Sequence, residues 1–77
     1  MPKIPVLSGD QAVKCFEKLS YQVVRQHGSH IRMHHKSDKS KNPLTIPRHK
    51  TLGKGLLRKL LRDADINIEK LIELRNW

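Results

Sequence analysis

Residues 21–36 read YQVVRQHGSHIRMHHK, and this stretch decides the fold. From 21 to 26 the chain is rich in strand-forming side chains that alternate between two faces. Gly28 then supplies the positive φ that a tight turn requires. A second strand is expected from His30 to about Lys36, so the stretch predicts an antiparallel β-hairpin.

The second strand of this hairpin carries two different kinds of side chain. Ile31 and Met33 share one face, because successive strand residues point to opposite sides of a sheet. His30, Arg32 and His34 share the opposite face. The alternation therefore predicts a strand with one apolar face and one basic face that bears histidines.

Sequence on both sides of the hairpin predicts the remaining elements. Ser8 and Gln11 have the spacing of a capping box, which begins a helix that is expected to end near Ser20. Beyond the hairpin and a polar, lysine-rich loop, residues 44–46 are predicted to form a short third strand. Prolines flank this strand on both sides, which suits an edge position where a missing amide costs little.

Apolar residues at helical spacing then predict two more helices. The stripe of the first consists of Leu56, Leu57, Leu60, Leu61 and Ala64. Asn67 is suited to cap the second, a short helix expected to be packed down by Ile68, Leu71 and Ile72. The predicted order is α-β-β-β-α plus a short C-terminal helix. This is an α+β fold, with a three-stranded antiparallel sheet packed on helices.

Size and composition limit the kind of protein that this chain can be. The 77 residues are expected to form a single domain, 1–77, with a small core. The one cysteine, Cys15, excludes an internal disulfide and a cysteine-based zinc site, and it favours a cytoplasmic location. The N-terminal segment is short and broken by prolines, so no signal peptide is expected. No apolar run approaches the length of a membrane span.

Positive charge is concentrated in the middle of the chain. The net charge is +9, and residues 25–62 contain eleven Lys or Arg residues against one acid, Asp38. The rest of the chain has five basic residues against six acidic ones, and all five histidines lie within the basic stretch. A short charged run is commonly only a solvated face. This asymmetry over half a domain instead favours a polyanionic partner such as nucleic acid.

His30 is the residue best placed for chemistry. It follows the glycine turn, opens a strand and has Arg25, Arg32 and Lys36 at neighbouring positions. Because histidine exchanges protons near neutral pH, it can deprotonate a ribose 2′-hydroxyl or protonate a leaving 5′-oxygen at a bound phosphodiester. Basic neighbours would stabilise charge on the phosphorus during such a reaction.

The other histidines admit several interpretations. His27, His34 and His35 are interpreted as solvated residues near strand ends. A metal site is disfavoured, because no Cys or Glu is close by and the surrounding positive charge repels a divalent cation. No metal or other cofactor is therefore expected. His49 is a candidate second proton carrier, with a phosphate contact or an inert surface residue as the alternatives.

Three segments together resemble a known family. Residues 25–30 read RQHGSH, residues 44–49 read LTIPRH and residues 55–61 read GLLRKLL. Following a capped helix and a strand, these segments resemble the HicA family, the toxin half of a bacterial type II toxin–antitoxin pair. The resemblance covers about residues 7–72, and its anchors are the Gly-Ser-His turn and the Thr-Ile-Pro-x-His segment. The chain departs from the family at Leu56, where Thr is frequent, and at Asp65, where Gly is common.

The resemblance implies a double-stranded-RNA-binding-domain-like fold and an endoribonuclease (an mRNA interferase) that cleaves mRNA. His30 takes the place of the family's catalytic histidine. A HicB-type antitoxin protein would cover the active face. The RNA-binding residues expected around His30 are Arg25, Gly28, Ser29, Arg32, Lys36, Arg48, His49 and Lys50. Three basic residues of the helix predicted over residues 56–64 are expected to widen this surface: Arg58, Lys59 and Arg62. A non-catalytic RNA-binding module is the alternative, because this fold supports both activities.

Overall fold

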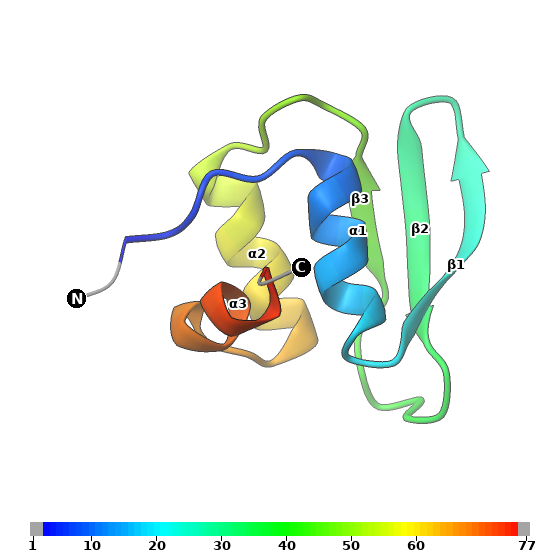
Figure 1. Cartoon of the computed structure of the whole chain (residues 1–77). Helices are drawn as coiled ribbons and strands as arrows, with labels where there is room; N and C mark the ends of the chain where they lie inside the picture. The colour runs from blue at the N-terminus through cyan, green and yellow to red at the C-terminus, as the bar shows by residue number, and fades with distance from the viewer. Residues whose placement is uncertain (1–2, 76–77) are drawn as a thin grey trace.

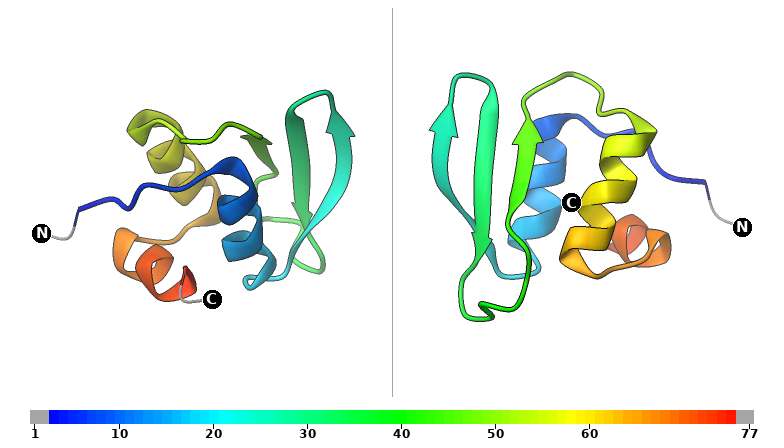
Figure 2. Two further views of the ribbon diagram at one scale, coloured as in Figure 1. Left: turned by 45° about the horizontal axis from the view of Figure 1, so that its top comes forward. Right: turned by 180° about the vertical axis from the view of Figure 1, so that it is seen from behind.

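The computed structural model describes residues 3–75, and its elements follow the predicted order. They are α1 (Gly9–Glu17), β1 (Tyr21–His27), β2 (His30–His35), β3 (Leu44–Pro47), α2 (Lys54–Ala64) and α3 (Ile68–Leu74). The strands form one antiparallel sheet in the order β1-β2-β3, with the helices on one side of it (Figure 1; Figure 2). The predicted α+β fold is confirmed.

The first helix begins as the sequence predicts and ends earlier. Ser8 Oγ accepts a hydrogen bond from the Gln11 amide over 3.1 Å, and Gln11 Oε1 accepts one from the Ser8 amide over 2.9 Å. This reciprocal pair is the predicted capping box. The helix ends at Glu17 rather than near Ser20, because residues 18–20 form a turn in which Ser20 has a φ of 70°.

The core lies between the helices and the inner face of the sheet. Ile31 and Met33 are both buried, as the alternation predicts. The Tyr21 ring meets the Phe16 ring edge to face at a centroid distance of 6.1 Å, and the Tyr21 hydroxyl donates to the Asn42 carbonyl over 3.1 Å. Side chains that complete the core include Leu7, Cys15, Leu44, Ile46, Leu57, Leu60 and Leu71.

The two C-terminal helices meet through a sharp bend. Asp65 caps α2 in the left-handed conformation, with a φ of 57°, and the Asn67 side chain accepts a hydrogen bond from the Lys70 amide over 2.8 Å. The predicted cap at Asn67 is confirmed. The prediction that Ile72 packs into the core is wrong, because Ile72 is 40% exposed and Leu74 is buried instead.

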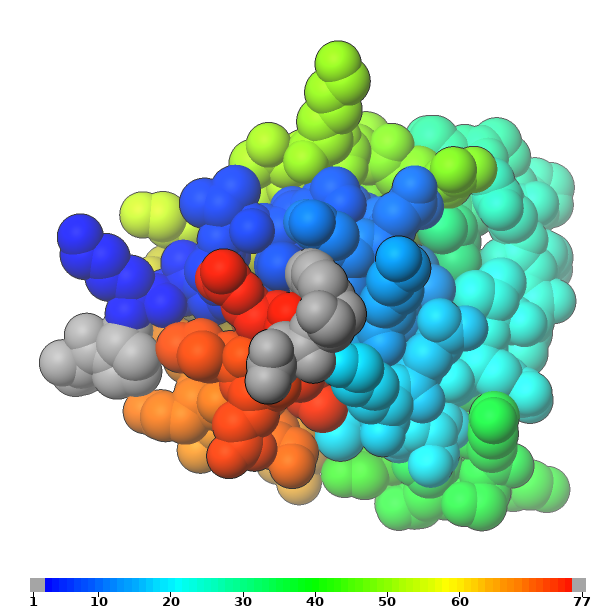
Figure 3. Space-filling model, in the orientation of Figure 1, coloured from blue at the N-terminus to red at the C-terminus, as the bar shows by residue number. Residues whose placement is uncertain are grey.

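The start of α1 is held against the segment that follows β3. The Gly9 amide donates to the His49 carbonyl over 2.9 Å, and the Leu52 amide donates to the Leu7 carbonyl over 2.8 Å. Figure 3 shows this contact as the N-terminal segment (blue) lying along residues near 50 (yellow-green). A side chain at Gly9 has no room, because its Cβ would lie 2.0 Å from the Pro47 carbonyl oxygen.

The β1–β2 hairpin extends past the cover that the helices provide. Only Tyr21 is buried among the seven residues of β1, while β2 and β3 contribute most of the sheet's buried side chains. The hairpin therefore leaves much of its surface open to a partner. Within residues 3–75, no helix has the length and apolar character needed to cross a membrane.

Candidate active site

A β-bulge in β1 decides which side chains reach the outer face of the sheet, the face turned away from the helices. Val23 pairs with Met33, but the next regular pair is Arg25 with Arg32, so Val24 is the extra residue. Strict alternation from Val23 would direct Arg25 to the inner face. The bulge turns it to the outer face instead, as bulges commonly do beside functional sites.

Five residues of the outer face line a shallow hollow of about 240 Å³. They are Arg25 and His27 from β1, His30 and Arg32 from β2, and Thr45 from β3. His27 lies directly opposite His30 at the closed end of the hairpin. Arg32 Nη1 donates a hydrogen bond to Thr45 Oγ1 over 2.7 Å, which fixes the guanidinium across the β2–β3 pair. This shared hollow is called the histidine hollow below.

The histidine hollow contains three predicted site residues and two that the sequence analysis did not assign to a site. Arg25, His30 and Arg32 are brought together as expected. His27 and Thr45 are the additions. The signal for His27 is the two-residue turn itself, because the residues on either side of such a turn are cross-strand partners.

The charge in the histidine hollow is positive and unbalanced. Arg25 lies opposite Arg32, a like-charge pairing that destabilises a sheet, and no carboxylate is among the described residues that line the hollow. Asp38 lies in the loop after β2, where hydrogen bonds from the Ser40 side chain and amide lower the pKa of its carboxyl. Two guanidinium groups are thus available to an external anion such as phosphate.

The turn beside His30 has the predicted geometry. Gly28 has a φ of 56°, which suits the first central position of a two-residue hairpin turn. The Ser29 carbonyl accepts a hydrogen bond from the Arg48 amide over 2.6 Å. This bond ties the turn to the segment after β3, so His30 occupies a fixed position at the end of the hairpin.

The three predicted RNA-binding residues after β3 lie outside the histidine hollow. The Arg48 guanidinium forms a two-pronged pair with Asp10 of α1, with Nε–Oδ1 at 3.0 Å and Nη2–Oδ2 at 3.3 Å. The His49 carbonyl accepts the bond from Gly9, and Lys50 is exposed. None of the three lines the histidine hollow. Of the three, Lys50 extends the positive surface beyond the end of β3, while the charge of Arg48 is paired with Asp10.

Lys36, the last predicted RNA-binding residue, lies at the other end of β2. It lines a second hollow of about 420 Å³ together with Lys39 and Lys41. A strand rises about 3.3 Å per residue, so the six steps from His30 to Lys36 span about 20 Å. The second hollow is therefore separate from the histidine hollow.

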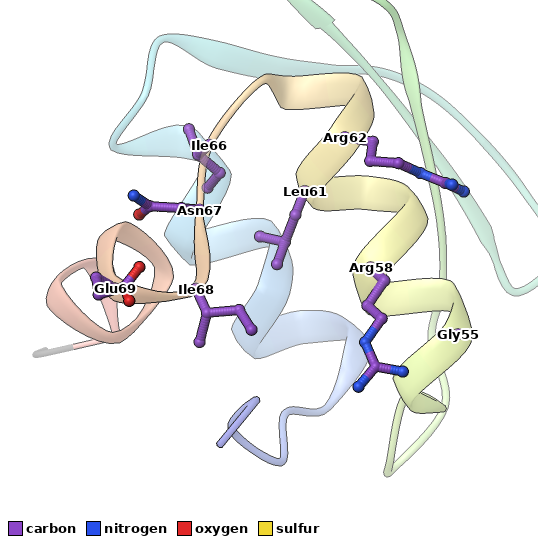
Figure 4. A pocket seen from close by; sticks show the side chains of 8 residues that line it. All are labelled: Gly55, Arg58, Leu61, Arg62, Ile66, Asn67, Ile68 and Glu69. Carbon is purple, nitrogen blue, oxygen red and sulfur yellow. The ribbon is translucent and has the colours of Figure 1, made fainter. Parts of the chain in front are cut away.

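A larger hollow, of about 780 Å³, lies in the helical layer between α2 and the start of α3 (Figure 4). Leu61, Ile66 and Ile68 give it an apolar lining, with Arg58 and Arg62 along its α2 side. It has no histidine, so the acid–base chemistry expected of the chain does not belong here. The sequence predicts that Arg58, Lys59 and Arg62 of α2 widen the RNA-binding surface. Of these three, Lys59 forms an ion pair with Asp63 over 2.9 Å, and the other two line this hollow.

Within residues 3–75, the structure offers neither a reactive cysteine nor a cluster of metal ligands. Cys15 is fully buried, and this burial raises the pKa of its thiol, so the reactive thiolate is disfavoured. Within residues 3–75, no group of three or more His, Cys, Asp or Glu side chains is arranged to hold a metal ion. The histidine hollow is the candidate active site.

Comparison with known proteins gives one match. A family model described as the HicA toxin of bacterial toxin–antitoxin matches residues 9–66, which is more than half of the chain. This range runs from the first residue of α1 past the end of α2 and includes every residue of the histidine hollow. No curated protein and no solved structure matches the chain.

Proposed function

The chain belongs to the HicA family of toxins from bacterial toxin–antitoxin systems, and from this premise we propose that it is an endoribonuclease that cleaves mRNA. Cleavage of mRNA in the cytoplasm would arrest translation. The catalytic residue is His30, which acts as a general acid or base. The reaction uses protein side chains and takes no metal ion or cofactor.

One observation carries this proposal: the exposed His30 imidazole shares a hollow with two guanidinium groups that lack a carboxylate partner there. A phosphodiester held by Arg25 and Arg32 would place a ribose 2′-hydroxyl or a 5′-oxygen beside His30. The guanidinium groups would then stabilise the negative charge that develops on the phosphate oxygens. Binding and proton transfer are thus served by neighbouring side chains.

The remaining predicted residues would guide RNA to and from this point. The exposed Gly28 and Ser29 amides border His30 and suit a phosphate oxygen. Arg48, His49 and Lys50 extend the surface on the turn side of the hollow, and Lys36 extends it toward the far end of β2. Contacts of this kind go to phosphates and set the position of the RNA without reading its sequence.

As a toxin of such a system, the chain has a cognate antitoxin. We propose that this partner is a HicB-type protein that covers the outer face of the sheet. The net charge of +9 favours a partner with an acidic surface, and covering the histidine hollow would block RNA by occupying the same positive groups.

The test is to produce the native chain and the His30→Ala variant in a bacterial host and to follow growth and mRNA integrity. The proposal predicts growth arrest and mRNA loss from the native chain only, while purified His30→Ala still binds RNA. Lys14→Ala, at an exposed position of α1 on the helical side of the sheet, is the control and should remain toxic.

Two results would contradict the proposal in different ways. Full toxicity of His30→Ala would remove His30 from the catalytic role. A native protein that binds RNA but neither cleaves it nor arrests growth would instead be a non-catalytic RNA-binding module.

A further inference from the structure

The histidine hollow contains a second imidazole with no structural task. His27 lies directly across from His30, and partners at such positions have Cβ atoms about 4.5–5.5 Å apart. Both side chains are exposed, and among the described residues neither imidazole takes part in a hydrogen bond, an ion pair or a ring contact. Both are therefore free to contact one bound group.

Cleavage of RNA by its own 2′-hydroxyl requires two proton transfers. A base removes the 2′-hydroxyl proton as the 2′-oxygen forms its bond to phosphorus. An acid gives a proton to the 5′-oxygen as the bond between phosphorus and that oxygen breaks. The products are a 2′,3′-cyclic phosphate and a 5′-hydroxyl, and the protein ends with the same number of protons. Two adjacent proton carriers suit this reaction.

We propose that His27 and His30 form this pair, one acting as the base and the other as the acid, so that His27 is a second catalytic residue. The inference rests on the proposed ribonuclease function. It assigns a role to a residue that counting by two from Val23 directs to the inner face, and the bulge at Val24 allows this residue to face outward opposite His30.

The surroundings of the pair favour this assignment over one that uses His49. His49 lies after β3 and is not among the residues that line the hollow. The charged groups that face the pair are Arg25 from β1 and Arg32 from β2, while β3 contributes the neutral Thr45. Past the turn, Arg48 is neutralised by its pair with Asp10. A scissile phosphate held by the two arginines would therefore lie beside both imidazoles, because the two cross-strand pairs are neighbours on the same face.

The first test measures cleavage of a short RNA by the purified full chain. His27→Ala and His27→Gln are each expected to cleave at least about 100-fold more slowly than the native protein, the lower limit for loss of one positioned proton carrier. Lys14→Ala, at an exposed position of α1 on the helical side of the sheet, should stay within a few-fold of native. The pH profile should be bell-shaped for the native protein and should lose one limb in His27→Gln, with apparent values that belong to the pair.

The second test separates proton transfer from phosphate binding. It uses RNA in which sulfur replaces the 5′-bridging oxygen at the cleavage site. A thiolate leaves without being protonated, because thiols ionise near pH 8.5. The alanine variant of whichever histidine is the acid should recover on this substrate, while the variant of the base stays slow. A residue that only binds or positions the phosphate gives the same loss on both substrates.

These results distinguish a failure of the His27–His30 pair from a failure of the proposed ribonuclease function. His27→Ala that cleaves ordinary RNA as well as Lys14→Ala would overturn the pair and leave His30 in place. A loss in His27→Ala and His30→Ala that is equal on both substrates would overturn it as well. A native protein that cleaves no RNA would remove the proposed function, and the pair would fall with it. Thermal unfolding of each variant checks that the hairpin still folds.

Discussion

Arg25 and Arg32 form a cross-strand pair of like charges in the histidine hollow. No Asp or Glu is among the described residues that line this hollow. Such a pair costs stability in the free protein and gives binding strength when an anion arrives. The Arg32 guanidinium is anchored by Thr45, whereas the Arg25 guanidinium has no hydrogen-bond partner within residues 3–75. Arg25 is therefore the residue at which stability and RNA binding should respond in opposite directions.

Replacing Arg25 by Gln should leave the free energy of unfolding unchanged or raise it by up to about 0.5 kcal/mol, because the repulsion from Arg32 is removed. The affinity for RNA should fall. The slope of log K against log salt should become shallower by the amount that one phosphate contact contributes. Urea unfolding and RNA titration at several salt concentrations measure both effects. Lys14→Gln, which removes an exposed charge from α1, is the control. Unchanged RNA affinity in Arg25→Gln would argue against Arg25 as a phosphate contact.

Gly9 is a second residue whose importance only the structure reveals. A Cβ at this position would lie 2.0 Å from the Pro47 carbonyl oxygen, so Gly9→Ala should lower the free energy of unfolding by about 1–3 kcal/mol through overpacking. Gly55→Ala is the matched control. It lies within α2, has open space around the Cβ position, and should raise stability by up to about 1 kcal/mol. Equal effects of the two substitutions in urea unfolding would contradict the close contact at Gly9.

The elements themselves were largely predictable, because each has a local signal in the sequence. The capping box at Ser8, the turn glycine Gly28 and the cap at Asn67 all lie where local rules place them. The bulge at Val24 has no such signal, since a Val-Val step continues a strand pattern equally well. Counting by two from Val23 directs His27 inward, whereas the two-residue turn pairs it with His30 on the outer face. The bulge in the structure reconciles these two signals.

The exposure of Ile72 illustrates the same limit at a helix. A stripe built from Ile68 and Leu71 is compatible with either Ile72 or Leu74 as its next member. The choice depends on how α3 is rotated against α1, which the sequence of α3 alone does not determine. In the structure Leu74 is buried and Ile72 is not.

The end of α2 gives a prediction that follows from its backbone. Asp65 holds a left-handed conformation that glycine adopts without cost, so Asp65→Gly should raise the free energy of unfolding by about 0.5–1 kcal/mol. Its pair with Lys41 at 3.9 Å is exposed and offsets little of this gain. Asp63→Gly, within the same helix, should instead lower stability by about 1 kcal/mol. A loss of stability in Asp65→Gly, measured by thermal unfolding, would contradict this interpretation.

In the protein as a whole, the two sides of the sheet differ in what they carry. The helices enclose the core on one side of the sheet, and the opposite side carries the histidine hollow near one end and the lysine-lined hollow near the other. Under the proposed function, an RNA strand that follows this face would pass His30 and continue over Lys36. The basic residues of α2, Arg58 and Arg62, instead line the hollow of the helical layer.

Binding along such a face should depend steeply on salt. Each phosphate neutralised on a single strand contributes a slope of about −0.7 to the dependence of log K on log salt. If Arg25, Arg32, Lys36 and Lys50 each contact one phosphate, raising the salt concentration from 50 to 200 mM should weaken RNA binding about 50-fold. Fluorescence anisotropy with a labelled RNA measures this change. A flat response would count against RNA as the ligand of this face.

Cleavage of a defined RNA by the purified native chain and by His30→Ala, both in the presence of a metal chelator, tests the central claim most directly. The account predicts that the native protein cleaves despite the chelator, and that His30→Ala binds the same RNA but cleaves it about 10²–10⁴-fold more slowly. Cleavage by His30→Ala at the native rate would contradict it.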